Sequence, residues 1–145
     1  MTERVKVFLD ASVLIAASDL DHEGYRRSRP LLAAATPQTC ACSTLSLAEL
    51  YANLSVVKGS RQQRPETALR LVEQIASRMM VVPLTPEEYL AAIRDAASSR
   101  IAGGTIYDAL LLACARKVNA ERIYTWNERH FKLIAPDLAE RIGRP

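Results

Sequence analysis

The sequence has few of the residues that cross-link small proteins or bind zinc. Its 145 residues include three cysteines, Cys40, Cys42 and Cys114, with no Cys-x-x-Cys spacing. An odd number of thiols without that spacing predicts neither a disulfide framework nor a zinc site. Cys40 and Cys42 stand one residue apart in an apolar segment, so we expect both side chains on one face of a buried strand.

Long apolar runs and a large net charge are also missing. No stretch approaches the roughly 18 uncharged apolar residues that a membrane-spanning helix needs. The N-terminus lacks the basic-then-apolar order of a secretory signal, so we expect a cytoplasmic protein without a membrane partner. A formal charge of +3 and a pI near 8.9 are compatible with a polyanionic partner but too mild to argue for one.

Hydrophobic residues make up 49% of the sequence and are spread evenly along it, which excludes disorder as the main state. The length fits one domain over residues 1–145. Short β-rich segments alternate with helical ones. We expect strands at residues 5–9, 39–43, 79–84 and 122–125, with a fifth at 133–135 as a further option. We expect helices from about residue 11 and at residues 22–35, 45–57, 65–78, 85–99 and 105–117, with Pro30 kinking or breaking the second.

The expected strands lack alternating polar residues, which is typical of a parallel sheet covered by helices on both faces. The sequence therefore predicts an α/β fold, a three-layer α/β/α sandwich around a mainly parallel sheet of four or five strands. Such sheets bind ligands at the carboxyl ends of their strands. Four polar residues stand after strands or early in helices: Asp10, Glu49, Asp108 and Asn127. Asp108 reaches that edge only if its helix begins there.

Each of the three acids also has a purely structural explanation. Asp10 could cap a helix. Ser46 and Glu49 have the spacing of a capping box, and Thr105 and Asp108 have a similar one. An acid in a first turn also suits the helix dipole.

Taken together, the three acids indicate a metal site. Asp10, Glu49 and Asp108 stand among apolar neighbours, where desolvating an unpaired carboxylate is costly. Converging carboxylates raise one another's pKa, and a hard divalent cation removes that repulsion. An oxygen donor set favours Mg²⁺ or Mn²⁺ over Zn²⁺, and such ions suit phosphoryl chemistry.

Four segments resemble, in order, the four motifs of the PIN-domain nucleases. They are FLDASVL at residues 8–14, SLAEL at 46–50, GGTIYDALL at 103–111 and TWNERHF at 125–131. Their order and spacing, and the chain length, are similar to those of the VapC-type toxins of type II toxin–antitoxin systems. The resemblance covers essentially the whole chain and implies a PIN-like fold.

The resemblance implies an endoribonuclease that uses Mg²⁺ or Mn²⁺. Such enzymes cleave RNA by attack of a metal-activated water on a phosphodiester and inhibit translation until an antitoxin blocks them. Asp10 and Asp108 would hold the metal directly, and Glu49 would bind through water or position the nucleophile. Ser12 and Thr125 would support these catalytic carboxylates through hydrogen bonds. The implied partners are RNA, a VapB-like antitoxin and a second copy of the chain, in a homodimer or a larger assembly.

Asn127 departs from the family pattern, which often has an acid at this place in the fourth motif. A neutral amide can coordinate or hydrogen-bond an ion but adds no charge, so a second metal should bind more weakly. We therefore expect one well-held metal, with Asn127 in a supporting role.

Basic and aromatic residues have two explanations each. Arg129 and His130 adjoin the fourth motif and could bind RNA phosphates, as could Arg26, or all three could be solvated surface charges. Trp126 could stack on a base or pack in the core. The many apolar residues at 31–35 and 47–54 could be helix core, or could line a groove for the antitoxin and a homodimer surface.

Two other functions stay open. A PIN fold could serve only to bind RNA or a partner, with weak or no cleavage, and Asn127 supports that alternative. An Asp-dependent phosphotransfer enzyme could use Asp10, but a haloacid-dehalogenase-type phosphatase would need Asp at position 12, where this sequence has Ser12. The acid pair and lysine of a response-regulator receiver are also missing.

Overall fold

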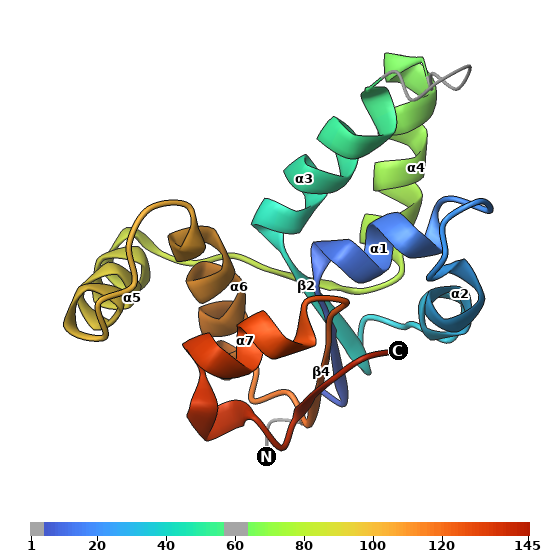
Figure 1. Cartoon of the computed structure of the whole chain (residues 1–145). Coiled ribbons are helices and arrows are strands. Elements are labelled where there is room, and N and C mark those ends of the chain that lie inside the picture. Colours follow the sequence, from blue (N-terminus) through green and yellow to red (C-terminus); the bar gives the residue numbers. More distant parts are fainter. Residues whose placement is uncertain (1–4, 57–63) are drawn as a thin grey trace.

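The computed structural model describes residues 5–56 and 64–145. Within these ranges, five strands form one parallel sheet in the order β3-β2-β1-β4-β5 (Figure 1). The strands are β1 (Val7–Leu9), β2 (Cys40–Ser43), β3 (Met80–Val82), β4 (Arg122–Tyr124) and β5 (Ile142–Gly143). The predicted α/β fold with a parallel central sheet is therefore confirmed.

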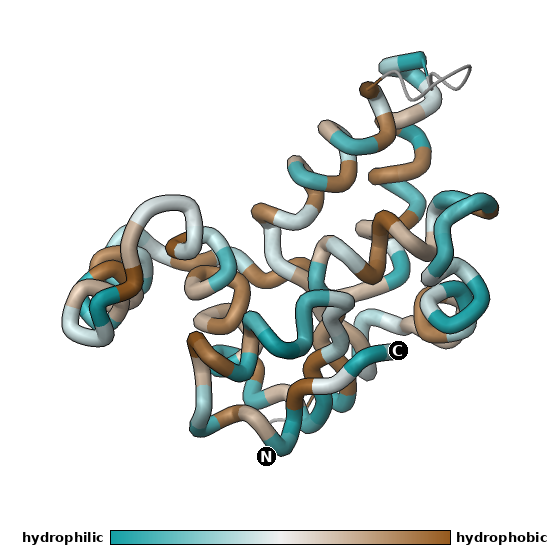
Figure 2. Tube along the Cα trace, viewed as in Figure 1, coloured by the Kyte–Doolittle hydropathy of each residue, from teal (hydrophilic) through white to brown (hydrophobic). Residues whose placement is uncertain are grey.

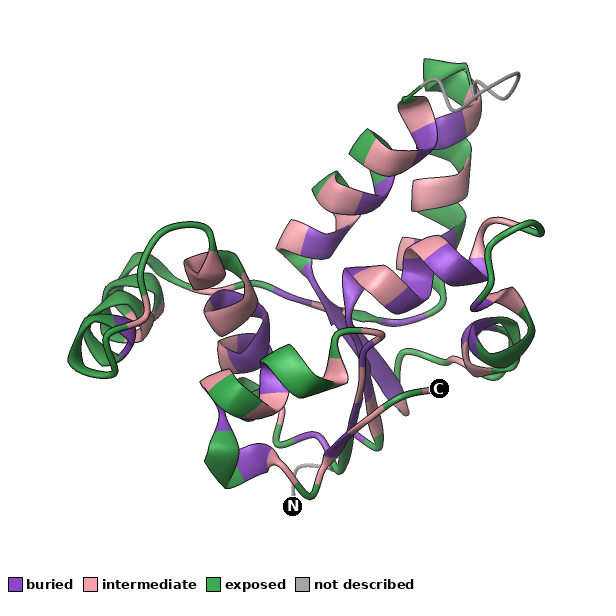
Figure 3. Ribbon diagram, in the orientation of Figure 1, coloured by how far each residue is buried: buried purple, intermediate pink, exposed green. Residues whose placement is uncertain are grey.

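Helices cover both faces of the sheet and make the three layers. One layer holds α1 (Ala11–Ala17), α2 (Tyr25–Ala33), α3 (Thr44–Ser55) and α4 (Pro65–Ser77). The other holds α5 (Pro86–Ser98), α6 (Thr105–Lys117) and α7 (Glu128–Ile134), followed by a short 3-10 turn at Pro136–Leu138. Figure 3 shows buried strands between these layers, while α5 packs on α6 and is mostly exposed.

The strands are short but bury both of their faces, which explains why they lack polar alternation. Leu9 packs with Cys40 and Cys42 against α1 and α3, and Phe8 packs with Ala41 against α6 and α7 on the opposite face. Both thiols of β2 thus lie on one face of a buried strand, as predicted. Burial raises the pKa of each of these two thiols to about 12.

The C-terminal region differs from the expectation at residues 133–135. These residues form no strand: Leu133 and Ile134 end α7, and the fifth strand is Ile142–Gly143. A short apolar run does not separate strand from helix by periodicity. Here Phe131, Ile134 and Ala135 pack on the core with helical spacing, so the tertiary contacts decide for a helix.

Helix α2 begins at Tyr25 rather than at residue 22, and Pro30 lies inside it without ending it. Its start is set by Gly24, where an added Cβ would lie 2.6 Å from ring carbons of Trp126. Any larger residue would push α2 away from that ring. In the preceding turn, Gly24 N donates a hydrogen bond to His22 Nδ1 at a distance of 2.9 Å.

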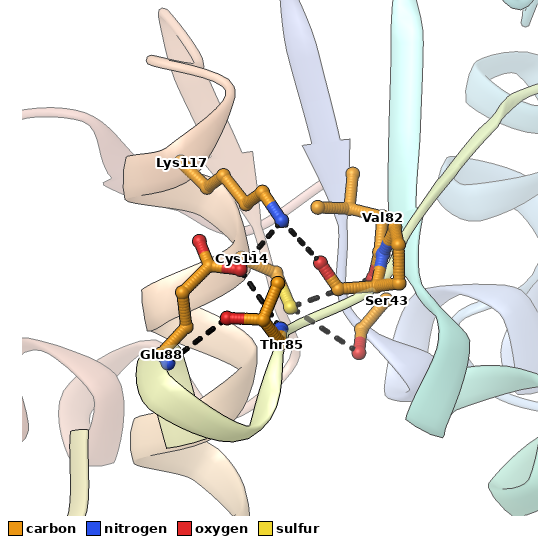
Figure 4. A network of polar contacts seen from close by, with 7 residues as sticks. Ser43, Val82, Thr85, Glu88, Cys114 and Lys117 are labelled. Atoms are coloured by element: carbon orange, nitrogen blue, oxygen red, sulfur yellow. Dashed lines mark hydrogen bonds and ion pairs between the residues drawn. The ribbon is translucent and has the colours of Figure 1, made fainter. Parts of the chain in front are cut away.

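A polar network holds the start of α5 against α6 (Figure 4). Thr85 and Glu88 form the capping box that begins α5. Lys117 Nζ of α6 donates to Glu88 Oε1 and to the Pro83 carbonyl oxygen, each at a distance of 2.7 Å. Cys114 Sγ contacts Ser43 Oγ at 3.5 Å, which ties α6 to the end of β2. No helix within the described ranges is long and apolar enough to cross a membrane.

Candidate active site

Asp10 lies at the carboxyl end of β1, the central strand of the sheet, and is 3% exposed. Its Oδ2 accepts hydrogen bonds from Ser12 Oγ at 2.7 Å and from Thr125 Oγ1 at 2.9 Å. Burial raises the pKa of Asp10, and the two hydroxyl donors partly oppose that rise. Asp10 occupies the N-cap position of α1, yet among the described residues its side chain makes no capping hydrogen bond. The Ser12 and Thr125 hydroxyls are therefore the side-chain partners that hold this carboxylate.

The two hydroxyls join α1 to the segment after β4. Ser12 Oγ accepts a hydrogen bond from Trp126 N at 3.0 Å, and Thr125 Oγ1 accepts one from Asn127 N at 3.0 Å. Thr125 is fully buried. Each hydroxyl therefore donates to Asp10 and accepts from the backbone, so rotation of either side chain would break two bonds. This fixes the carboxylate in one orientation.

Glu49 lies in α3, and the capping-box explanation for it is wrong. The helix begins at Thr44 with Ser43 as its N-cap, and Ser43 Oγ accepts from Leu45 N at 3.1 Å. Ser46 is therefore inside the first turn, fully buried. Glu49 Oε1 is buried and has no hydrogen-bond partner among the described residues. Burial, followed by the negative charges of Asp10 and Asp108, raises the pKa of Glu49 to about 7.

Asp108 lies in the first turn of α6, whose N-terminus points to the same edge of the sheet as Asp10. Asp108 Oδ2 is 3.0 Å from His130 Nε2 of α7. Burial and the charge of Asp10 raise the pKa of Asp108, while His130 opposes the rise. The expected capping arrangement is not found in the described structure, because the N-cap is Gly104, which has no side chain to offer.

The three carboxylates thus come within electrostatic reach of one another from three separate stretches of chain. They do not form a closed cage: across residues 5–56 and 64–145, no three His, Cys, Asp or Glu side chains lie close enough to hold one ion between them. Mg²⁺ needs only one or two direct carboxylates because it keeps several waters. The oxygen donors and the unpartnered buried Glu49 Oε1 fit such an ion.

The family of the chain follows from a comparison with family profiles. The profile described as the PIN domain matches residues 7–135. The chain belongs to the PIN-domain family. No curated protein matches the sequence itself.

Solved structures with the PIN fold extend this comparison. VapC20 of Mycobacterium tuberculosis, described as a sarcin–ricin loop cleaving toxin, is 17% identical, with a TM-score of 0.68 over 86% of this chain and 92% of that one. VapBC of Salmonella typhimurium bound to DNA is 21% identical, with a TM-score of 0.65 over 97% and 98% of the two chains. VapBC2 of Rickettsia felis bound to a promoter fragment is 21% identical, with a TM-score of 0.60 over 90% and 93%. At these identities the likeness shows the shared fold.

The fourth PIN motif lies where β4 leads into α7. Asn127 is the N-cap residue of α7 and is exposed, and its side chain makes no capping bond within the described structure. Arg129 and His130 are exposed on the first turn of α7, and His130 alone of the two is in contact with Asp108. The motif therefore brings the imidazole of His130 to the edge of the carboxylate cluster.

Arg144 lies beside the fourth motif, and the sequence did not predict it as a candidate site residue. Its guanidinium carbon lies 5.0 Å from the centre of the Trp126 ring. Trp126 also packs on the core around α1 and donates from Nε1 to Ser28 Oγ at 2.9 Å, which favours the packing explanation for this residue. No local pattern marks Arg144, because its position depends on β5 joining the sheet beside β4.

Proposed function

We propose that this PIN-domain protein is a metal-dependent endoribonuclease that uses Mg²⁺ or Mn²⁺. The observation that carries the proposal is the buried and unpartnered carboxylate oxygen of Glu49 in the described structure. Its buried Oε1 has no partner among the described residues, and the charges of Asp10 and Asp108 help to raise its pKa to about 7. A fold without a cation would gain by replacing such a group with a neutral one. Asp10, Glu49 and Asp108 are therefore proposed as the catalytic carboxylates.

The proposed roles follow from the contacts of each residue. Asp10, fixed by two hydroxyls at the end of β1, is the most rigid metal ligand. Asp108 is the second direct ligand, and Glu49 binds through water or orients the attacking water. A divalent ion held there would polarise the phosphodiester and stabilise the charge that develops on it. Asn127 adds an amide without charge, which supports one well-held ion rather than two.

The toxin role is proposed from the structural relatives. Two of the relatives are described as VapBC bound to DNA, and VapC20 is described as a toxin that cleaves the sarcin–ricin loop. We infer that this protein also inhibits translation by cleaving RNA and is blocked by a VapB-like antitoxin. Exposed apolar residues on α3 and α5 offer surfaces for the antitoxin and for a homodimer. They are Tyr51, Tyr89, Leu90 and Ile93.

The decisive experiment measures cleavage of structured RNA by the purified protein. Cleavage is expected with Mg²⁺ or Mn²⁺, and is expected to disappear with EDTA and in Asp10→Asn and Asp108→Asn. Asp95→Asn, a change at an exposed acid on α5, is the matched control and should leave the rate unchanged. Cleavage that survives both site substitutions would show that the assigned carboxylates are wrong.

A PIN-fold protein that binds RNA or a partner without cutting it is the second candidate. It is favoured by the absence, within the described residues, of three acids already grouped around one point, and by the neutral Asn127. In that case RNA would bind but remain intact at every Mg²⁺ and Mn²⁺ concentration. The same assay therefore separates the two functions.

A further inference from the structure

Arg144 and Trp126 stand between two hollows on the surface. The first hollow, of about 720 Å³, is lined by the first turn of α7, including Asn127 and His130, together with Trp126 and Arg144. The second, of about 710 Å³, is lined by Arg26 and Arg27 of α2 together with the same Trp126 and Arg144. The two hollows therefore meet at this pair. The first one is linked to the carboxylate cluster through His130, which lines it and contacts Asp108.

The pair is built on a fixed base. Trp126 Nε1 donates to Ser28 Oγ, and Ser28 is fully buried. Gly24 lies against the ring so closely that no Cβ would fit. The indole cannot turn without breaking both contacts, so it holds the Arg144 guanidinium at a defined place through the cation–π contact. Arg144 is itself exposed, which leaves its N–H groups able to reach a ligand.

The charge of the joined hollows is positive. Arg26, Arg27 and Arg129 are exposed on their walls, and Arg144 adds a fourth guanidinium. Lys132 is neutralised by Glu128, whose Oε1 lies 2.7 Å from Nζ. Glu23 is the remaining acid on the second wall. Figure 2 shows hydrophilic segments where α7 begins, on α2 and at the C-terminal end of the chain. Guanidinium groups bind phosphates through paired hydrogen bonds and also stack on bases.

We propose that a single-stranded segment of the RNA substrate crosses the Trp126–Arg144 pair, from the carboxylates to α2. The inference rests on the proposed function, which it deepens by assigning the path of the strand. Arg144 binds a phosphate at the crossing point, and Arg26 and Arg27 bind the next ones. An acidic peptide would match the charge, but the contact of His130 with Asp108 at one end of the first hollow favours the polymer whose phosphodiester is cut at the carboxylates.

Binding is measured in EDTA, so that the result does not depend on cleavage. Trp126 is the one tryptophan of the sequence, and it lines both hollows, so its emission reports occupancy. A 12-nucleotide single-stranded RNA of mixed sequence should quench it saturably. Arg144→Gln, and separately Arg26→Gln combined with Arg27→Gln, should weaken binding about tenfold and lower the salt dependence by about one phosphate contact per arginine. Arg94→Gln, an exposed change on α5, is the matched control and should bind as the original protein does.

The KM and kcat of RNA cleavage distinguish binding of the RNA strand by Arg144 from a purely structural role of Arg144. In Mg²⁺, Arg144→Gln should raise KM several-fold and leave kcat unchanged, and Arg144→Lys should restore part of the loss. The proposal is overturned by unchanged affinity in the arginine variants, or by poly-glutamate quenching Trp126 as well as RNA does. Arginine-dependent binding without cleavage would support the path and refute the nuclease. Cleavage with an unchanged KM in the arginine variants would support the nuclease and refute the path.

Discussion

His130 Nε2 of α7 lies 3.0 Å from Asp108 Oδ2 of α6. The pair joins the third and fourth PIN motifs, which are separated along the chain by β4. The imidazole also opposes the rise in the pKa of Asp108 that burial and Asp10 cause. Glu49 Oε1 is buried and has no such partner in the described structure.

Asp108→Asn is expected to leave the metal-free melting temperature unchanged or raised. The amide oxygen can still accept a hydrogen bond from His130, while the repulsion with Asp10 and Glu49 is removed. The same change should abolish the rise in melting temperature that Mg²⁺ produces, because a ligand that binds the folded state stabilises it. Thermal unfolding with and without Mg²⁺ measures both effects. A clear fall without metal would support a structural role for Asp108 instead.

Thr125→Val is expected to destabilise the protein by about 1–3 kcal/mol, the range for buried polar groups left without partners. The change removes the donor to Asp10 Oδ2 and the acceptor of Asn127 N. Thr125→Ser keeps both bonds and is the control. Urea unfolding of the three proteins measures the difference. Equal stability of the Val and Ser variants would show that the hydroxyl does not hold Asp10.

The stability of the metal-free protein is expected to fall as pH rises from about 5 to 8. The pKa of Glu49 is about 7 in the folded state, against 4.5 as the ordinary value. Its contribution is therefore fully present below about pH 4.5 and is lost as pH rises through 7. Glu49→Gln should flatten this dependence, as should saturating Mg²⁺, which favours the charged form. Melting temperatures in EDTA across this range measure it, and an identical slope in Glu49→Gln would contradict the assignment.

Asp10 and Asp108, whose pKa values are also raised, should add a loss of stability of the same sign, whereas acids paired with lysine or arginine should not disturb that window. Lys117 and Lys132 lower the pKa of Glu88 and of Glu128, and Arg116 lowers the pKa of Asp137. The stability from these pairs is present above the ordinary pKa of each acid and is lost only as pH falls below it. Stability from Glu49 is therefore lost as pH rises, whereas stability from the three ion pairs is lost as pH falls, and the two effects occur in different pH ranges.

Asn127→Asp is expected to lower the Mg²⁺ concentration needed for half-maximal cleavage. A fourth carboxylate at the start of α7 would add negative charge beside the cluster and strengthen cation binding. The measurement is the rate of RNA cleavage against Mg²⁺ concentration. An unchanged midpoint would show that residue 127 does not act on the ion.

The sequence predicted the sheet and the place of Asp10 because Asp10 directly follows a buried strand, and parallel strands end at one edge. The supporting role of Thr125 came only from the resemblance to PIN domains. The place of Asp108 depends on which way α6 runs across the sheet, which tertiary contacts decide. The capping box at Ser46 and Glu49 was wrong because the N-cap of α3 is Ser43, three residues before Ser46, and such small shifts of a helix end are hard to predict.

The C-terminal region was the least predictable part. β5 has two residues, too few for a pattern, yet it brings Arg144 to Trp126. The run at 133–135 fits either a strand or a helix, and the packing of Phe131 and Ile134 settles it. The two basic hollows follow from these contacts and have no signal in the linear sequence.

The proposal depends most on Asp10 and Asp108 binding one divalent ion directly, with Glu49 acting on it through water. Its most direct test is a crystal of the protein soaked in Mn²⁺, with the ion located by its anomalous scattering. We expect one strong peak contacted by Asp10 and Asp108 on the side of Glu49, and no such peak in Asp10→Asn crystals. Active RNA cleavage with Mn²⁺ bound elsewhere, or with no peak at this edge of the sheet, would contradict the account.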